Sequence, residues 1–236
     1  MTPKTLLCLL LGFAALPTLA ANDANTAPHA PGIESKGYVW NQKDKDETEA
    51  LSRTGDPVKG KAAYRVCLGC HKDNAAGQPD ADFPQLAGQH KTVLIKQIID
   101  TRTGRRDNPK MHPFVAGEVL NLQEIADLAA YLNSLPIPTT NAKGDGKHTD
   151  RGKIIYDKDC AQCHGDHGEG NASGFYPLVA SQHYGYLLYE TQQIRDGGRR
   201  NANPKMVNIV KKYSDTDLGY VADYMSRLAP PARANP

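Results

Sequence analysis

The sequence has few of the large apolar side chains that fill protein cores: its 236 residues include only four Phe, one Trp and four Met. After the first twenty residues, no segment stays apolar over the roughly 20 residues that a membrane-spanning helix needs. Nor does any stretch alternate apolar and polar residues with β-branched side chains over the length of a strand, so no β-sheet is expected. The fold class that remains is all-α.

An excess of charge of one sign is also missing. The formal net charge is +2, and it falls to +1 without the first twenty residues, which contain one basic residue and no acidic one. Strong attraction to nucleic acid or to anionic lipid is therefore not expected. Residues 21–57 contain more acidic than basic residues, seven against four, above all in KDKDETE at 43–49, and the rest of the chain is mildly basic.

Residues 1–20 have the pattern of a secretory signal peptide. Lys4 precedes the apolar run TLLCLLLGFAAL, and small residues allow cleavage near Ala20. A membrane anchor is the weaker alternative because the run is short. We therefore expect export to the periplasm, and an acidic, partly disordered extension at 21–55, of which 21–35 have almost nothing to bury. Trp40 either packs on a domain or is exposed.

The rest of the chain contains one module twice. Each copy has a C-x-x-C-H motif: CLGCH ends at His71 and CAQCH ends at His164. The same landmarks surround both motifs in the same order: Gly60 and Gly152, Tyr64 and Tyr156, Pro84 and Pro177, His90 and His183, the GRR and NPKM segments, and Tyr131 and Tyr224. We infer a tandem duplication, with domains at 56–136 and 150–230, a linker at 137–149 and a tail at 231–236.

Helices are expected at the start, middle and end of each copy. Asp56 before Pro57 is typical of a helix start. The closing helices begin with residue pairs that resemble capping boxes, Asn121 with Glu124 and Ser214 with Asp217. The middle helices are expected at KTVLIKQIID and GYLLYETQQIRD, each followed by glycine, and much of the segment between His71 and Lys91 is expected to be loop.

Three chemistries can use the paired cysteines Cys67 and Cys70, and Cys160 and Cys163. A zinc site needs four ligands together, but the two pairs are more than 90 residues apart. A thioredoxin-like redox pair is expected near a βαβ pattern, which is missing here. Covalent haem attachment fits best, because each thiol can form a thioether while the adjacent histidine, His71 or His164, faces the iron. Two haem c groups would also supply the missing apolar volume.

Met111 and Met206 are the candidates for the second iron ligand. They occupy the matched NPKM positions, and a thioether is a soft ligand suited to haem iron. Met225 is expected in the core of the last helix. The competing ligands are His90 and His183, which also match between the copies. The remaining histidines are expected at the surface: His29, His112, His148 and His167.

With its double C-x-x-C-H motif and matched methionines, the chain from about residue 56 to 230 resembles the dihaem cytochrome c4 family. The resemblance implies three to four helices around each haem, and two haems that approach at an interface with a pseudo-two-fold axis. It also implies that the carbonyls of Pro84 and Pro177 orient the iron-binding histidines. Four arginines then become candidate partners of the haem propionates, with a solvated basic loop as the alternative: Arg105, Arg106, Arg199 and Arg200.

Iron with histidine and methionine on its two axial sides has no position for a substrate, so the sequence favours an electron carrier over an enzyme. The expected partners are redox proteins: a dehydrogenase or quinol-oxidising complex as donor and an oxidase or reductase as acceptor, including docking to a membrane complex. One alternative is the cytochrome subunit of a periplasmic dehydrogenase complex, for example in sulfide or thiosulfate oxidation. The other is a dihaem peroxidase in which one methionine leaves its iron.

Overall fold

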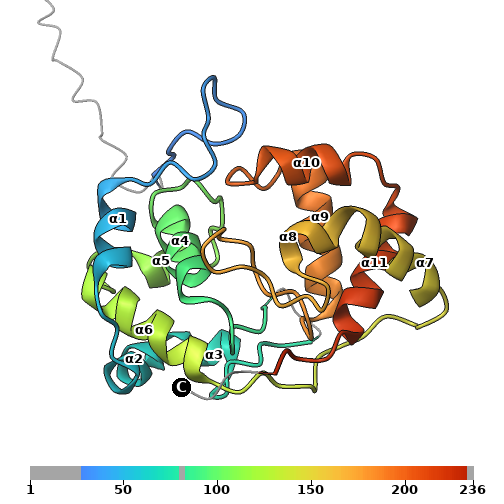
Figure 1. The fold of residues 1–236 in the computed structure, drawn as a ribbon. Helices are drawn as coiled ribbons and strands as arrows, with labels where there is room; N and C mark the ends of the chain where they lie inside the picture. The colour runs from blue at the N-terminus through green and yellow to red at the C-terminus, as the bar shows by residue number, and fades with distance from the viewer. Residues whose placement is uncertain (1–27, 80–82, 233–236) are drawn as a thin grey trace, which may run out of the picture.

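In the computed structural model the described residues are 28–79 and 83–232, and they form two helical domains side by side (Figure 1). The expected signal peptide, residues 1–20, lies outside the described residues. The first domain contains α1 (Lys45–Ser52), α2 (Pro57–Ala63), the 3₁₀ turn η1 (Tyr64–Cys67), α3 (Leu68–His71), α4 (Lys91–Arg102), α5 (His112–Val115) and α6 (Leu122–Ser134). The second contains α7 (Thr149–Ile155), the π-helical turn η2 (Tyr156–Cys160), α8 (Ala161–His164), α9 (Tyr184–Asp196), α10 (Pro204–Val210) and α11 (Asp215–Arg227).

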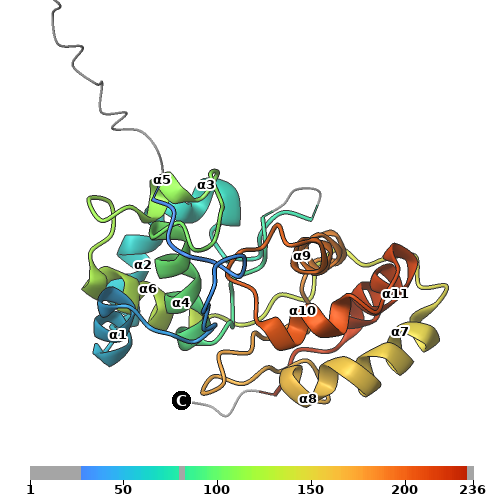
Figure 2. The same cartoon turned by 90° about the horizontal axis from the view of Figure 1, so that it is seen from above.

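The all-α prediction is confirmed. Across residues 28–79 and 83–232, strand-like pairing is limited to one isolated bridge in each copy, Gln78 with Phe83 and Asn171 with Tyr176. No helix of the described part of the chain is long and apolar enough to cross a membrane. Each domain has its own hydrophobic core, and the views from the front and from above show the domains as separate helical groups (Figures 1 and 2).

The helix starts lie where the capping residues predict them. The side chain of Asp56 accepts a hydrogen bond from the backbone N–H of Val58 at 2.8 Å and so caps α2. Asn121 and Glu124 form the complete capping box of α6. Ser214 caps α11. These caps satisfy backbone donors that the first turn of a helix leaves unpaired.

A matched glycine lets the first and last helices of each domain cross closely. A Cβ atom on Gly60 of α2 would lie 2.0 Å from the carbonyl oxygen of Asp127 on α6. A Cβ atom on Gly152 of α7 would lie 2.1 Å from the carbonyl oxygen of Tyr220 on α11. No side chain fits in either space, so the glycine repeated in the sequence marks the same helix crossing twice.

The two copies differ by one residue between the helix crossing and the cysteines. Three positions separate Tyr64 from Cys67, but four separate Tyr156 from Cys160. The first copy spans the interval with a tight 3₁₀ turn, and the second absorbs the extra residue in a wider π-helical turn. Both cysteine pairs therefore follow their helix in equivalent positions.

The described part of the N-terminal extension, from residue 28 onward, contacts both domains, although composition alone predicts disorder for residues 21–35. The backbone N–H of Ala30 donates to the carbonyl of Thr103, and that of Ile33 donates to the carbonyl of Arg200. Residues 45–52, for which no helix was predicted, form α1, which is capped by Asp44 and contacts α4 and α6. Contacts with both domains order a segment that has little apolar surface of its own.

The predicted linker contains no helix before Thr149, but it is not a free spacer. Its Asn141 is buried and donates from Nδ2 to the carbonyl oxygens of Gln182 and Ser226. The linker backbone therefore packs against the second domain over part of its length.

Candidate haem sites

The first domain encloses a cavity of about 310 Å³ beside its C-x-x-C-H motif. Cys67, Cys70 and His71 line it from η1 and α3, and Met111 lines it from the residue just before α5. Apolar side chains of α4 and α6 complete much of the wall: Leu94, Ile98, Leu128 and Leu132. The structure thus brings the predicted cysteines, histidine and methionine of this copy to one cavity.

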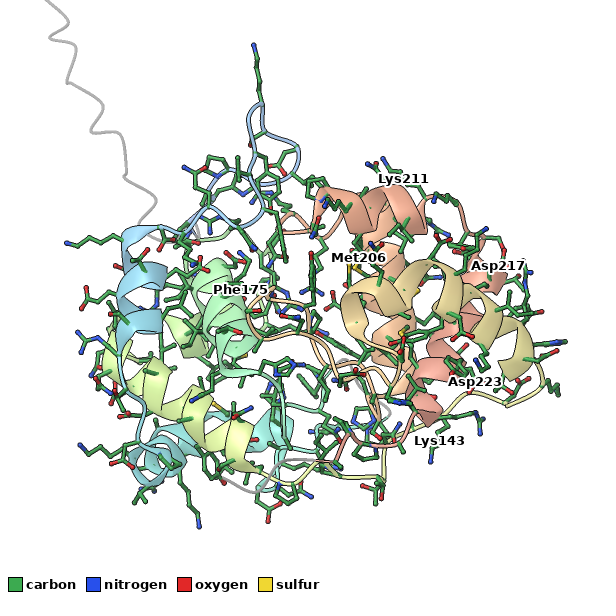
Figure 3. The ribbon with its side chains drawn as sticks, viewed as in Figure 1. Lys143, Phe175, Met206, Lys211, Asp217 and Asp223 are labelled. Carbon is green, nitrogen blue, oxygen red and sulfur yellow. The ribbon has the colours of Figure 1, made fainter. Side chains whose placement is uncertain are left out.

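The second domain repeats this arrangement around a cavity of about 230 Å³. Cys160, Cys163 and His164 line it beside η2 and α8, and Met206 lines it from α10. Figure 3 shows Met206 between α10 and α8. The apolar wall again comes from the middle and last helices, with Leu187, Ile194, Leu218 and Val221. Met225 is buried in the core of this domain, as predicted, and also reaches the cavity wall.

The two histidines are held in the same orientation. Nδ1 of His71 donates to the carbonyl oxygen of Pro84 at 3.0 Å, and Nδ1 of His164 donates to that of Pro177 at 2.9 Å. These are the proline contacts expected from the resemblance. Burial lowers the pKa of both imidazoles more than these hydrogen bonds raise it. Each ring is therefore neutral with Nε2 left for a metal.

The environment of the cysteines argues against zinc and against a thiolate redox site. Burial raises the pKa of Cys67 to about 11 and that of Cys160 to about 12, whereas reactive redox thiols have lowered values. In the described ranges no three His, Cys, Asp or Glu side chains come together in a way that could hold a metal ion. An apolar cavity with two thiols, one imidazole and one thioether on its wall fits covalently attached haem instead.

The four candidate arginines separate into two pairs. Arg106 and Arg199 line both cavities, whereas Arg105 and Arg200 line neither. The backbone N–H of Arg106 donates to the carbonyl of Asp100, and that of Arg199 donates to the carbonyl of Gln193. Asp100 and Gln193 are 93 residues apart, like His71 and His164. Arg106 and Arg199 are therefore the equivalent residues of the two copies.

Arg105 and Arg200 instead hold the N-terminal extension. Arg105 forms ion pairs with Asp44 at 3.6 Å, with Glu47 at 3.8 Å and with Asp100 at 2.8 Å. Arg200 pairs with Glu34. Contacts with propionates are therefore not supported for these two arginines. The sequence did not predict this division of the arginines, because GRR occurs in both copies and its residues were matched in order. The second GRR is in fact shifted by one residue against the first, so that Arg106 corresponds to Arg199.

Between the cavities, Arg106 and Arg199 share two acceptors that are also equivalent in the copies. Arg106 donates to Oε1 of Gln97 at 3.1 Å and to Oε1 of Glu190 at 2.6 Å. Arg199 donates to the same Gln97 atom at 2.9 Å and to Oε2 of Glu190 at 2.6 Å. All four side chains, together with Tyr186, line both cavities. The two cavities therefore share one polar wall at the domain interface.

Glu190 gives the shared wall a charge in the second copy that has no counterpart in the first. Its counterpart in the first copy is the neutral Gln97. Burial alone would raise the pKa of Glu190, but the charges of Arg199 and Arg106 outweigh burial and hold the pKa at about 2. The cluster therefore contains two positive charges and one negative charge at neutral pH. The sequence offers a signal for this pair, since the two residues occupy the same position in α4 and α9.

His90 and His183, the competing iron ligands, bind across the domain interface instead. Nε2 of His90 donates to the carbonyl of Glu169 at 2.8 Å, and Nε2 of His183 donates to that of Ala76 at 2.8 Å. Ala76 and Glu169 each lie five residues after the C-x-x-C-H histidine of their copy. Neither histidine lines either of these two cavities. The repeated histidine is therefore a contact between the domains, related by a pseudo-two-fold axis.

The residue before each of these histidines forms a second symmetric contact. Gln89 accepts from the N–H of Leu178 at 3.0 Å and donates to its carbonyl at 3.0 Å. Gln182 accepts from the N–H of Gln85 at 2.9 Å and donates to its carbonyl at 2.9 Å. Gln85 and Leu178 are equivalent residues, because each directly follows the matched proline of its own copy, Pro84 or Pro177. The loops that carry Pro84 and Pro177, whose carbonyls orient the C-x-x-C-H histidines, are thereby fixed against each other.

Among the four histidines without a repeat partner, His29, His148 and His167 are exposed and His112 is partly buried. None of the four lines either of the two cavities beside the C-x-x-C-H motifs. They take no part in the two sites.

Comparison with known proteins agrees with the geometry. The family model "Cytochrome c" matches residues 57–136 and 149–229. The cytochrome c4 of Azotobacter vinelandii is 31% identical over 74% of this chain and 90% of its own length. The chain belongs to the cytochrome c4 family. The crystal structure of reduced recombinant cytochrome c4 from Pseudomonas stutzeri has a TM-score of 0.67 and 26% identity, with 75% of this chain and 100% of that chain covered.

A third relative has a name that points to a partner. The thiosulfate dehydrogenase electron acceptor of Stutzerimonas stutzeri is 34% identical over 70% of this chain and 80% of its own length.

With this family membership, the two cysteine pairs bind two covalent haem c groups. Like its cytochrome c4 relatives, the chain transfers electrons.

The residues of the chain have defined tasks in this transfer. The haem iron supplies the one-electron redox couple. The cysteines fix the position of each haem, and the proline carbonyls fix the ring orientation of His71 and His164. Gln89, Gln182, His90 and His183 hold the two cavities side by side. Two cavities that share a wall would place their haems next to each other, which would favour passage of an electron between the domains.

Proposed function

We propose that the chain is a periplasmic carrier that holds one iron between His71 and Met111 and the other between His164 and Met206. The observation that carries this proposal is that each cavity is lined by one proline-oriented histidine and one methionine, at matched positions of the two copies. Met111 and Met206 are two of the three methionines after residue 20. A thioether ligand raises the potential of haem iron, which suits a carrier that accepts electrons from a dehydrogenase.

We also propose that Arg106 and Arg199 face the haem propionates. Both arginines line both cavities at the shared polar wall. Each guanidinium has five N–H donors in a planar fork, which suits a carboxylate. With one carboxylate among them, the cluster has a net positive charge to offset propionates.

Saturated iron coordination separates a carrier from a dihaem peroxidase. If both methionines bind iron, the reduced protein has no position for carbon monoxide. The test is a spectrum of the native reduced protein before and after addition of carbon monoxide, with the Met206→Ala variant as the positive control. An unchanged spectrum of the wild type beside a carbon monoxide adduct in the variant supports the carrier. An adduct in the wild type would contradict it.

The favoured donor is a thiosulfate dehydrogenase. The support is the 34% identity to the thiosulfate dehydrogenase electron acceptor of Stutzerimonas stutzeri. The test mixes this chain, in the oxidised state, with the thiosulfate dehydrogenase of that organism and thiosulfate, and follows haem reduction. The cytochrome c4 of Azotobacter vinelandii serves as the comparison acceptor. Fast, saturable reduction of this chain supports the assignment, and a rate no higher than without enzyme rejects this donor while leaving the carrier function intact.

A stable complex with a catalytic chain would instead make the protein a subunit of a dehydrogenase. Export of the chain is part of the same proposal, because a signal peptide is expected at residues 1–20 and cleavage near Ala20. Purification from a periplasmic extract tests both points. N-terminal sequencing of the purified protein locates the cleavage site, and a catalytic chain that co-purifies with it would favour the role as a dehydrogenase subunit.

A further inference from the structure

The N-terminal extension crosses from one domain to the other before α1 begins. Residues 28–44, which we call the strap, contact the first domain through Ala30, whose N–H donates to the carbonyl of Thr103 at 3.0 Å. They contact the second domain through Ile33, whose N–H donates to the carbonyl of Arg200 at 2.8 Å. In Figures 1 and 2 this segment, in blue, leads from α1 toward the loop before α10. The strap therefore bridges the two haem domains.

Arg200 fastens the strap at this crossing. Its side chain is only 11% exposed and donates to the carbonyl of Ala30 at 2.8 Å and to Oε1 of Glu34 from two nitrogens, at 2.5 and 3.1 Å. It also donates to the carbonyl of Gly104 in the first domain at 2.6 Å and to Nδ1 of His29 at 3.0 Å. The hydrogen bonds from Arg200 lower the pKa of Glu34 to about 2. One arginine thus joins the strap to both domains.

Trp40 is placed by the strap at the second cavity. Its ring stacks on Tyr176 with 5.7 Å between centroids and an angle of 12° between the planes, and it lines that cavity. Tyr176 lies next to the second iron-binding histidine, His164, with 6.5 Å between ring centroids. Lys43 adds a cation contact to Phe175, 5.2 Å from the ring centroid. Figure 3 shows Phe175 on the loop that the second domain extends toward the first.

The first cavity has no such cover among residues 28–79 and 83–232. Phe83 occupies the position equivalent to Tyr176, and the aromatic contact it makes there is with His71. No residue of the strap lines the first cavity, and two apolar side chains on its wall are exposed, Val66 by 44% and Phe114 by 40%. The duplication is symmetric in its ligand residues, but the strap covers only one of the two sites.

We propose that the strap is a cover for the second haem, and that Trp40 raises the potential of that haem by keeping water from its edge. The physical reason is that oxidised iron carries one more positive charge than reduced iron. Water stabilises the more highly charged state, so excluding water favours the reduced state and a higher potential. The proposal requires haem in the second cavity but does not depend on the identity of the partner or on the methionine ligands.

The experiment compares the midpoint potentials of holoprotein variants by spectroelectrochemical titration. Trp40→Ala removes the cover, and Val39→Ala, at an exposed neighbouring residue, is the matched control. Tyr176→Ala and Phe83→Ala identify which potential belongs to the second and the first haem. We expect Trp40→Ala and Tyr176→Ala to lower the same potential and Val39→Ala to change neither. Two unchanged potentials in Trp40→Ala, equal shifts of both, or a shift of the potential that Phe83→Ala moves would each overturn the proposal.

Tryptophan fluorescence gives an independent reading, because Trp40 is the only tryptophan of the chain. A ring this close to haem loses its excitation energy to the porphyrin, so the wild-type holoprotein should emit weakly. Glu34→Gln weakens the attachment to Arg200 without touching the cavity, and we expect emission to rise while the potential of the second haem falls. Strong emission from the wild type, or an unchanged emission and potential in Glu34→Gln, would show that the strap does not cover the site.

Discussion

The symmetric glutamine contacts between the domains allow a quantitative prediction. In Gln89→Ala, the N–H and carbonyl of Leu178 lose their side-chain partner, and in Gln182→Ala the same groups of Gln85 do. All four residues are buried. An unpaired buried polar group costs about 1 to 3 kcal/mol, so each variant should lose about 2 to 4 kcal/mol of unfolding free energy if water enters in part.

Denaturant unfolding of the holoprotein, followed by circular dichroism, measures this loss. Gln192→Ala is the control, since it removes one hydrogen bond of an exposed pair, to Asp215, and should change stability by less than about 0.5 kcal/mol. The double variant should lose less unfolding free energy than the two single variants together. Both side chains hold the same interface, and the first substitution already opens it to water. Losses below about 0.5 kcal/mol in both single variants would refute the role of these contacts.

Two further predictions concern the helix crossings and the shared polar wall. Gly60→Ala and Gly152→Ala should each lower the unfolding free energy by about 1 to 3 kcal/mol, since the new methyl group meets a backbone carbonyl. Gly117→Ala is the control, because its methyl group enters open space and should not change stability. Melting temperatures of the Gly60 and Gly152 variants equal to that of the control would contradict this. The pKa of Glu190 is held at about 2 instead of the ordinary 4.5. The ionised carboxylate therefore contributes about 3 kcal/mol to the free energy of unfolding above pH 4.5, and this contribution is lost as the pH falls toward 2. Glu190→Gln should flatten the fall of stability in this window, and an unchanged pH profile would contradict the buried pair.

Much of the site was predictable because the duplication repeats it. Cys67, His71 and Pro84 recur at constant separation in the second copy, and so do the residues that cap the helices. Repetition also drew attention to His90 and His183, but spacing alone cannot tell an iron ligand from a contact between domains. The carbonyl that each ring binds lies in the other copy, about 80 to 110 residues away, and no local pattern records such a pairing.

The features that the sequence did not predict arise where the two copies differ. The π-helical turn absorbs one extra residue before Cys160, and the extra residues after Arg199 place Arg200 against the strap instead of a cavity. The strap itself has no repeat counterpart and little apolar surface. Its order comes from tertiary contacts with Arg105, Arg200 and Tyr176, which composition cannot show.

The thioether-to-iron charge-transfer band of the oxidised protein tests the central claim most directly. If each cavity holds haem iron between its histidine and its methionine, Met111→Ala and Met206→Ala should each remove about half of this band, and the double variant should remove all of it. Met225→Leu, a change in the core of the second domain, should leave the band intact. A full-intensity band in either alanine variant would contradict the assignment of that methionine and with it the proposed closed coordination of its haem.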